Sequence, residues 1–329
     1  MKRRQLIEGV AGSSLAWATR AEAQQQARER VVGVAFGSVA SDPEAQERAA
    51  AFRQGLRELG WIDGRNVRFE YRWMGNNPER ARSLAADLIA LAPDVILSSG
   101  TVATTALHGL TRQIPIVFVN VTDPVAGGFV ASLSHPGGNV TGFTPFEYPI
   151  AGKWLEQLRE IAPRVSRVAL LGDPNNHNYQ GFWRPFEEAA RRLAVQPLQT
   201  PARDAAEIER GILALASEPN GGLVVTAAIF SLLHRELIIG LAARHKLPAI
   251  YWTRFFPQTG GLVSYGPNSN QLHRQSATYV DRILKGERPE KLPVQEATTF
   301  ELVLNQKTAR ALDLAVSPLT FARADEVID

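Results

Sequence analysis

From Val31 onward, short apolar runs alternate with amphipathic stretches, and this alternation constrains the fold more than any other feature of the chain. Runs such as 31–36 and 116–119 are typical of strands that are covered on both faces of a sheet. The stretches between the runs place apolar residues at helical spacing, as with Ala49, Phe52 and Leu56. This pattern predicts an α/β fold with parallel sheets.

The first 23 residues have the pattern of an export signal. Three basic residues at 2–4 precede a short, moderately apolar segment at 6–17, and Ala-Glu-Ala at 21–23 is a small-x-small cleavage site. The segment is too short to span a bilayer, which needs roughly 20 apolar residues. Adjacent arginines before a weak apolar segment favour a twin-arginine signal, so we expect a soluble periplasmic protein that starts near Gln24. An ordinary amphipathic N-terminal helix is the alternative.

Composition excludes several classes of function. Removing residues 1–23 lowers the formal net charge from +3 to +1, and no run of Lys and Arg interleaved with aromatic residues remains for nucleic acid. The chain has no cysteine, which excludes disulfides, thiolate metal sites, a cysteine nucleophile and a lipid-anchored cysteine. The six histidines are scattered without metal-ligand spacing, and no Gly-x-Gly-x-x-Gly follows the first strand. We therefore expect no metal, no cofactor and no catalytic residues.

The remaining length of about 306 residues is more than one core usually organises and predicts two lobes. Stretches rich in Gly and Pro near 136–142, 257–267 and 286–293 suggest that the chain crosses between the lobes three times. We assign 30–143 with 254–290 to an N-terminal lobe, and 144–253 with 291–329 to a C-terminal lobe.

The candidate site follows from the carboxyl ends of the predicted strands, because ligands of open parallel sheets bind there, against helix N-termini. Hydroxyls, amides, two carboxylates and aromatic rings at these ends suit a small polar zwitterion. We expect Ser99 and Thr101 to hold a carboxylate and Asp123 to meet an ammonium group. Core packing is the alternative for each aromatic residue, and helix capping is the alternative for Asp123 and Asp173. The candidate ligand-binding residues are Ser38, Ser99, Thr101, Thr122, Asp123, Phe143, Asp173, Asn176, Tyr179, Phe230, Trp252 and Tyr265.

Several segments together resemble the family of ABC-transporter substrate-binding proteins that is assigned to tryptophan and tyrosine transport. They are DPV at 123–125, SHPGGNVTGF at 134–143, LAARHKLPAIY at 241–251, GGLVSYG at 260–266, ILKG at 283–286, LPVQ at 292–295, FELVLN at 300–305 and ARADEVI at 322–328. The resemblance implies a type I periplasmic-binding fold, with two Rossmann-like lobes, three hinge strands and a ligand enclosed between the lobes. It also implies a non-catalytic, monomeric receptor that delivers its ligand to an ABC permease and ATPase.

The chain departs from that family at two strand ends. Asp-Pro-Asn-Asn at 173–176 replaces a simpler Asn-Pro pattern, and Ala227 and Ala228 replace a polar or acidic residue. The second change leaves a less polar wall, so an aromatic or branched carboxylate suits the site as well as an amino acid does. Two other classes of function stay open: an exported α/β enzyme, and a sensor module of the same fold. The first lacks a Ser/His/Asp order and metal ligands, and a repressor-type sensor would need a helix-turn-helix ahead of Val31.

Overall fold

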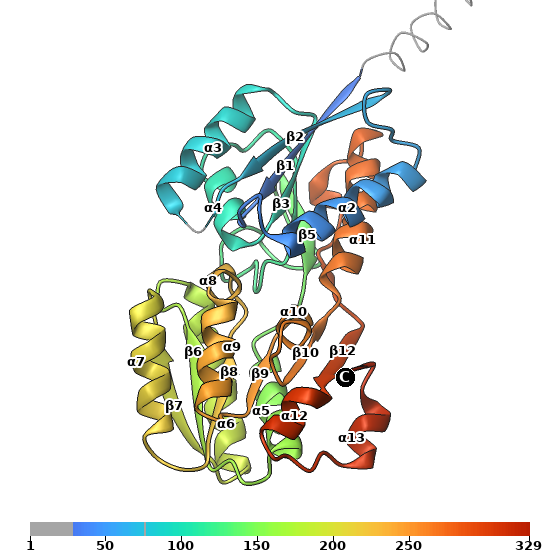
Figure 1. Cartoon of the computed structure of the whole chain (residues 1–329). Coiled ribbons are helices and arrows are strands. Elements are labelled where there is room, and N and C mark those ends of the chain that lie inside the picture. Colours follow the sequence, from blue (N-terminus) through green and yellow to red (C-terminus); the bar gives the residue numbers. More distant parts are fainter. Residues whose placement is uncertain (1–28, 76) are drawn as a thin grey trace, which may run out of the picture.

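A computed structural model describes residues 29–75 and 77–329, which form two α/β lobes, one above the other in Figure 1. The predicted export signal at 1–23 lies outside the described residues. Each lobe is built around its own sheet, and the strand order within both sheets requires crossover connections. The predicted α/β fold with parallel sheets in two lobes is therefore confirmed.

The N-terminal lobe contains a six-stranded parallel sheet in the order β11-β5-β4-β3-β1-β2. Alternate residues of its central strands face opposite helix layers, because side chains along a strand alternate between the two faces. Val117 and Val119 pack beneath α2 and α11, whereas Ile116 and Phe118 pack beneath α3 and α4. The elements of this lobe are β1 (Arg30–Phe36), α2 (Pro43–Glu58), β2 (Val67–Trp73), α3 (Pro78–Ala90), β3 (Val95–Ser99), α4 (Thr101–His108), β4 (Ile116–Val119), β5 (Val140–Thr144), α11 (Ser269–Leu284), the 3-10 turn η1 (Pro289–Lys291) and β11 (Gln295–Glu296).

The C-terminal lobe contains a seven-stranded sheet in the order β13-β12-β10-β9-β8-β6-β7. Its strands pair in parallel except for β10 with β12, which run antiparallel. The elements of this lobe are α5 (Ile150–Ile161), β6 (Arg167–Gly172), α6 (His177–Arg192), β7 (Gln196–Pro201), α7 (Ala205–Ala216), β8 (Gly221–Val225), α8 (Ile229–Leu233), α9 (Arg235–Arg244), β9 (Ala249–Tyr251), α10 (Phe255–Gln258), β10 (Val263–Pro267), β12 (Phe300–Asn305), α12 (Gln306–Ala311), α13 (Pro318–Arg323) and β13 (Glu326–Ile328).

Many helices begin at the residue that the sequence provides for capping. Asp42 accepts a hydrogen bond from the Glu44 amide at 3.2 Å, and Asn77 accepts one from the Arg80 amide at 2.9 Å. Both caps are followed by proline at the first helical position, where a missing N–H costs nothing. These caps fix where α2 and α3 start, and therefore how the strand ends meet the helices.

The chain crosses between the lobes three times, after β5, after β10 and after β11. Two boundaries differ from the assignment made from the sequence. Residues 254–267 lie in the C-terminal lobe, because β10 pairs with β9 and β12 of that sheet. Residues 291–296 lie with the N-terminal lobe, because β11 pairs with β5. The stretch rich in Gly and Pro at 257–267 is therefore a turn and a strand within the C-terminal lobe, and the second crossing follows it directly, before Ser269. The stretch at 286–293 likewise lies within the N-terminal lobe, ahead of the third crossing.

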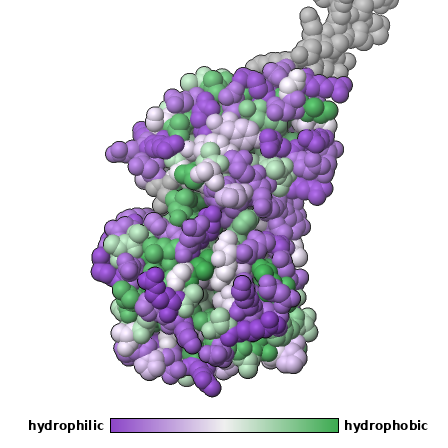
Figure 2. Space-filling view, in the orientation of Figure 1, coloured by the Kyte–Doolittle hydropathy of each residue, from purple (hydrophilic) through white to green (hydrophobic). Residues whose placement is uncertain are grey.

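The lobes contact each other directly. A Cβ placed on Gly37 or on Gly100 would lie 3.5 Å or 3.7 Å from side-chain atoms of Ile229, the first residue of α8 in the opposite lobe. Figure 2 shows a largely hydrophilic face over both lobes, with hydrophobic side chains gathered at the waist between them. Within the described part of the chain, no helix combines the length and apolar character needed to cross a membrane.

Candidate ligand-binding site

A cavity of about 700 Å³ lies between the lobes, and both lobes and the first crossing line it. Its walls come from the carboxyl ends of parallel strands, which is where the strand pattern predicts a site. The N-terminal wall comprises Arg48, Pro78, Glu79, Ala81, Arg82, Ser99, Gly100, Thr101, Val102, Thr105, Ala106, Gly109, Asn120 and Thr122. The C-terminal wall comprises Asp173, Asn175, Asn176, Asn178, Arg203, Ala227, Ala228, Ile229, Phe230 and Trp252, and the crossing adds Pro145 and Phe146.

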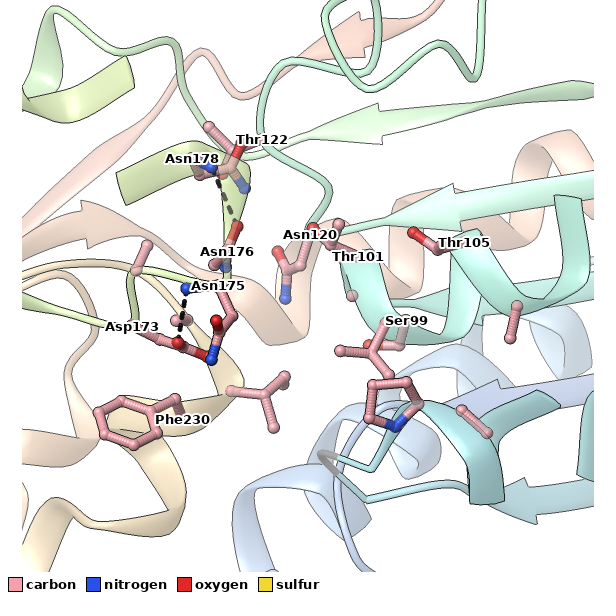
Figure 3. Close-up of a pocket in the computed structure, with 18 of the residues that line it drawn as sticks. Ser99, Thr101, Thr105, Asn120, Thr122, Asp173, Asn175, Asn176, Asn178 and Phe230 are labelled. Atoms are coloured by element: carbon pink, nitrogen blue, oxygen red, sulfur yellow. Dashed lines mark hydrogen bonds between the residues drawn. The ribbon is translucent and has the colours of Figure 1, made fainter. Parts of the chain in front are cut away.

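The turn from β3 into α4 forms the centre of the N-terminal wall. Gly100 has φ of +89° and ψ of 160°, a conformation that is essentially restricted to glycine. No side chain of the described residues caps α4, so its first amides are free to bind an anion at the positive end of the helix. Ser99 and Thr101 flank the turn and add two hydroxyls to the cavity wall. Figure 3 shows both beside the start of this helix.

A buried histidine lies behind Ser99. The Ser99 Oγ is 2.9 Å from Nε2 of His273, and Nδ1 of His273 is 2.7 Å from the Ser269 carbonyl oxygen. Burial is the main cause that lowers the pKa of His273 to about 3, the charge of Arg48 lowers it further, and the carbonyl of Ser269 opposes the shift. The imidazole is therefore neutral at physiological pH.

A charged cluster of Asp42, Glu44 and Arg48 lies at the start of α2. The Arg48 side chain is only 1% exposed, forms an ion pair with Glu44 and lines the cavity. Burial lowers the pKa of Arg48 to about 10, and the charge of Asp42 works in the opposite direction. Asp42 also lies 3.7 Å from the guanidinium of Arg235, which belongs to the other lobe. The two negative charges of Asp42 and Glu44 therefore offset the two positive charges of Arg48 and Arg235, and the cluster has no net charge.

The turn from β6 into α6 forms the polar half of the C-terminal wall. Asp173 accepts a hydrogen bond from the Asn175 amide at 2.9 Å, and Asn176 accepts one from the Asn178 amide at 3.0 Å (Figure 3). Asn178 in turn accepts a hydrogen bond from the Tyr148 hydroxyl at 3.0 Å. These bonds use the turn's own amides, so one negative charge, that of Asp173, faces the cavity from a half-buried side chain.

Apart from Arg203, which pairs with Glu207, the remainder of the C-terminal wall is apolar. Ala227, Ala228 and Ile229 follow β8, as the departure from the family pattern predicts. The rings of Phe230 and Trp252 are 4% and 5% exposed and complete this surface. The indole N–H of Trp252 donates to the Ser231 hydroxyl at 3.2 Å, which leaves the apolar part of the ring for a ligand.

Seven of the residues predicted from the sequence line the cavity. They are Ser99, Thr101, Thr122, Asp173, Asn176, Phe230 and Trp252. The other five do not line it: Ser38, Asp123, Phe143, Tyr179 and Tyr265.

Asp123 is the most consequential of the five, because it is the residue predicted to meet an ammonium group. Its carboxylate accepts a hydrogen bond from the Ala126 amide at 2.9 Å, and its backbone adopts a left-handed φ of +45°. It therefore stabilises its own turn, and because residues 124–128 form a turn and no helix, Asp123 is not a helix cap either. Burial and, secondarily, the charge of Asp123 raise the pKa of Tyr148 to about 12, which places this carboxylate near the first crossing.

Three aromatic candidates pack within the lobes instead. Phe143 contacts Tyr279 with 4.8 Å between ring centroids, and Tyr265 stacks on Phe300 at 5.6 Å. The Tyr179 hydroxyl donates to the Leu170 carbonyl at 3.2 Å from a side chain that is 2% exposed. Ser38, which is 1% exposed, is likewise enclosed beside β1.

Sequence reasoning missed Arg48 and Asn120. Asn120 directly follows β4 and has a left-handed φ of +58°, so the rule of strand ends could have found it. Its Oδ1 is buried without a hydrogen-bond partner among the described residues, and the side chain reaches the cavity. Arg48 could have been noticed because it lies on the same helix face as Ala45, Ala49 and Phe52. A charged residue within an otherwise apolar helix face indicates a buried charge.

The fold and the cavity together define a class of protein: a two-lobed solute receptor that encloses a small molecule between parallel sheets. The profile of the family "ABC transporter substrate binding protein" matches residues 33–328. The chain therefore belongs to this family, whose members bind a small-molecule ligand and work with the components of an ABC transporter. It is a family of solute-binding proteins rather than of enzymes.

Several known proteins are similar to this chain over most of its length. A tyrosine-binding protein of Clostridioides difficile is 22% identical over 302 residues, which covers 89% of this chain and 85% of that protein. A solved structure of a conserved domain protein from Vibrio cholerae gives a TM-score of 0.84 at 26% identity and covers 91% of this chain and 100% of that one. An ABC domain from Streptococcus pneumonia, solved in complex with L-Trp, gives a TM-score of 0.84 at 22% identity and covers 92% and 100%.

Proposed function

We propose that this protein is the periplasmic receptor of an ABC importer and that it binds an amino acid with an aromatic side chain. The single observation that carries this proposal is the division of the cavity wall. Free helix amides and hydroxyls lie on one side. The carboxylate of Asp173, which forms no ion pair within residues 29–75 and 77–329, lies on the other, and an apolar surface lies next to it. A cavity of about 700 Å³ suits a ligand of this size, since small-molecule sites span roughly 300–1,000 Å³.

Each part of an amino acid has a counterpart in this wall. The ligand carboxylate would lie at the N-terminus of α4, against the free amides and the Thr101 hydroxyl. The negative charge of Asp173 would attract the ammonium group, in the role first expected for Asp123. The side chain would pack on Phe230 and Trp252, where aromatic surfaces offer both apolar area and ring stacking. The amino acids named for two similar proteins, tyrosine and tryptophan, agree with this assignment.

Calorimetric titration of the purified protein with L-tryptophan, L-tyrosine, L-phenylalanine and the branched amino acids tests the proposal. We expect at least one aromatic amino acid to bind with a Kd in the micromolar range or tighter. Aromatic and branched carboxylates that lack the amino group serve as the matched comparison. If such a carboxylate binds as tightly as the amino acid, the amino-acid assignment fails. Mass spectrometry of the compound that co-purifies with the protein gives an independent answer.

Export through the twin-arginine system is also part of this proposal, and it rests on the sequence at residues 1–23. Replacing Arg3 and Arg4 by lysine keeps the charge but removes the guanidinium pair. We expect the doubly substituted precursor to stay in the cytoplasm, as measured by fractionation and immunoblotting. Normal periplasmic yield of the variant would leave only a general export signal. We further propose that the mature receptor acts as a monomer.

A further inference from the structure

The hydrogen-bond direction at Ser99 can be assigned from its partners. The carbonyl oxygen of Ser269 can only accept, so Nδ1 of His273 must carry the proton of that 2.7 Å contact. A neutral imidazole carries one N–H, which leaves Nε2 as an acceptor. The Ser99 hydroxyl must therefore donate its only proton to Nε2 across 2.9 Å. Ser99 lines the cavity, and any further contact to its Oγ, including one from a ligand, can use only the lone pairs.

The neutral state of His273 is well supported by its surroundings. The side chain is 0% exposed, its ring stacks on Phe36 at 5.7 Å between centroids, and its pKa is lowered to about 3. Arg48 is the charged group whose field reaches the imidazole, and a nearby cation disfavours a second proton on the ring. The direction of the Ser99 hydrogen bond is therefore constant across the physiological pH range.

An acceptor at Ser99 is unusual, because the next residues in the chain form a site for an anion. The free amides of α4 begin at Thr101, two positions after Ser99, and they favour a carboxylate. Lone pairs on Ser99 disfavour a carboxylate oxygen but favour an N–H or O–H group. Donor amides and an acceptor hydroxyl side by side match the head of an α-amino acid, in which the two charged groups are joined through one carbon.

We propose that His273 is a positioning residue that holds Ser99 as a hydrogen-bond acceptor in the cavity. Ser99 thereby selects a ligand that carries a donor beside its carboxylate, such as an α-amino acid, over the simple carboxylate. This inference rests on the proposed function, because it names the ligand group that this part of the site recognises. The charge of Arg48 does not oppose it, since Arg48 is paired with Glu44 and faces Asp42.

The ratio of affinities for L-tryptophan and indole-3-propionate tests the inference, because these probes differ only in the α-amino group. If L-tyrosine or L-phenylalanine binds more tightly than L-tryptophan, that amino acid and its des-amino analogue replace the pair. We expect Ser99→Ala to reduce the ratio by about 10- to 100-fold, the range for one hydrogen bond to a charged group. Ser99→Thr keeps a hydroxyl and should restore most of the ratio.

Ser98→Ala is the matched control. Ser98 precedes Ser99 on β3, bonds to the Thr104 hydroxyl at 2.8 Å and does not line the cavity. Its removal should lower Tm but leave the affinity ratio unchanged. An equal ratio in Ser99→Ala and wild type would overturn the inference while leaving the proposed function intact. Failure of the wild type to bind any of the three aromatic amino acids would instead overturn the proposed function.

The role of His273 is tested through Ser99. His273→Phe keeps a ring to stack on Phe36 but offers no acceptor, so the Ser99 hydroxyl becomes free to donate. Indole-3-propionate should then bind more tightly and the ratio should fall about tenfold or more. In the Ser99→Ala background, the same substitution should not change the ratio further. Equal effects in both backgrounds would mean that His273 acts only through packing. If His273→Phe does not fold, the Ser99 variants still decide whether the acceptor selects the ligand.

Discussion

Asp173 provides the negative charge on the C-terminal wall, and it can be neutralised without disturbing the turn that holds it. Asparagine retains the oxygen that accepts from the Asn175 amide, so Asp173→Asn removes little except the charge. We expect the affinity for the aromatic amino acid to fall about tenfold, or about 1.4 kcal/mol, a modest value because the side chain is half-buried. Calorimetry measures the affinity, and an unchanged Tm shows that the turn is preserved.

Asp123→Asn is the control for that experiment. Asp123 carries the same charge and also accepts from a backbone amide of its own turn, but it does not line the cavity. Its neutralisation should leave the affinity within about twofold of wild type. A large loss in Asp123→Asn combined with no loss in Asp173→Asn would return the ammonium site to the position expected from the sequence.

The lowered pKa of His273 also predicts how the free energy of unfolding depends on pH. Its pKa is lowered in the folded state from 6.5 to about 3, so between these values the unfolded chain binds the additional proton. The free energy of unfolding should therefore fall as pH drops from 6.5 toward 3, by up to about 1.4 kcal/mol per pH unit from this residue. Denaturant unfolding at pH 7, 6 and 5 measures the slope. His273→Phe should show a shallower slope, and identical slopes would contradict the burial of a neutral imidazole.

Residues of the site could be predicted from the sequence where the position of the backbone alone decides whether a residue lines the cavity. Ser99 and Thr101 flank a glycine between a buried strand and a helix, and this arrangement places them at the cavity. Tyr265 lies in the middle of β10, and its ring packs against Phe300. Which face of the sheet a side chain occupies depends on strand pairing, and one position of register reverses it. Sequence position alone therefore could not separate these cases.

Among the elements, the contact between α2 and α11 depends on a glycine. A Cβ at Gly55 would lie 2.6 Å from the Arg274 carbonyl oxygen and 2.8 Å from the Ala277 Cβ. Alanine favours a helix over glycine by about 1 kcal/mol, yet we expect Gly55→Ala to be destabilising because the clash involves backbone. The free energy of unfolding, from chemical denaturation, should fall by about 1–3 kcal/mol.

Gly240→Ala provides the matched substitution in another helix. Gly240 lies within α9, and apart from its own helix and chain neighbours nothing in residues 29–75 and 77–329 comes within 4 Å of an added Cβ. This substitution should raise the free energy of unfolding by about 0.5–1 kcal/mol. Stabilisation in both variants would show that α2 and α11 can move apart at little cost.

The strand and helix order was largely predictable because apolar periodicity reports it directly. The assignment of elements to lobes was less predictable, because Gly and Pro are enriched both at turns within a lobe and at crossings between lobes. The segment 257–267 contains such residues, but its strand β10 pairs between β9 and β12. That pairing joins residues from distant parts of the chain, and no local pattern encodes it. The antiparallel direction of β12 likewise could not be predicted, because the spacing of apolar residues along a strand does not depend on the strand's direction.

For the whole molecule, a contact between the lobes adds to the free energy of closure. Arg235 at the start of α9 lies 3.7 Å from buried Asp42 at the start of α2, and Arg235 does not line the cavity. Ligand contacts to both lobes also stabilise the closed arrangement. Arg235→Gln should therefore weaken ligand binding by about two- to tenfold without changing any contact to the ligand. Exposed Arg184, whose partner Glu188 lies in its own helix, supplies the control variant Arg184→Gln.

Small-angle scattering separates this effect from a direct one. Ligand should reduce the radius of gyration of the wild type, because closure brings the lobes together. At saturating ligand Arg235→Gln should reach the same closed radius, but it should need more ligand to do so. A radius that does not change with ligand in the wild type would contradict closure as the binding mechanism.

The three crossings have a consequence for how the protein is made. The apolar face of the N-terminal sheet that α2 covers is completed only by α11, whose residues Leu272, Ala277 and Val280 join the same core. The C-terminal sheet likewise is complete only after β12 and β13 have been synthesised, and β13 ends at Ile328. A ribosome that has synthesised the first 150 residues therefore carries an unfinished lobe with an exposed apolar face, and neither lobe can mature before nearly the whole chain has emerged. The emerging chain should depend on chaperones until synthesis ends, and the two lobes should complete their folding together rather than in the order of translation.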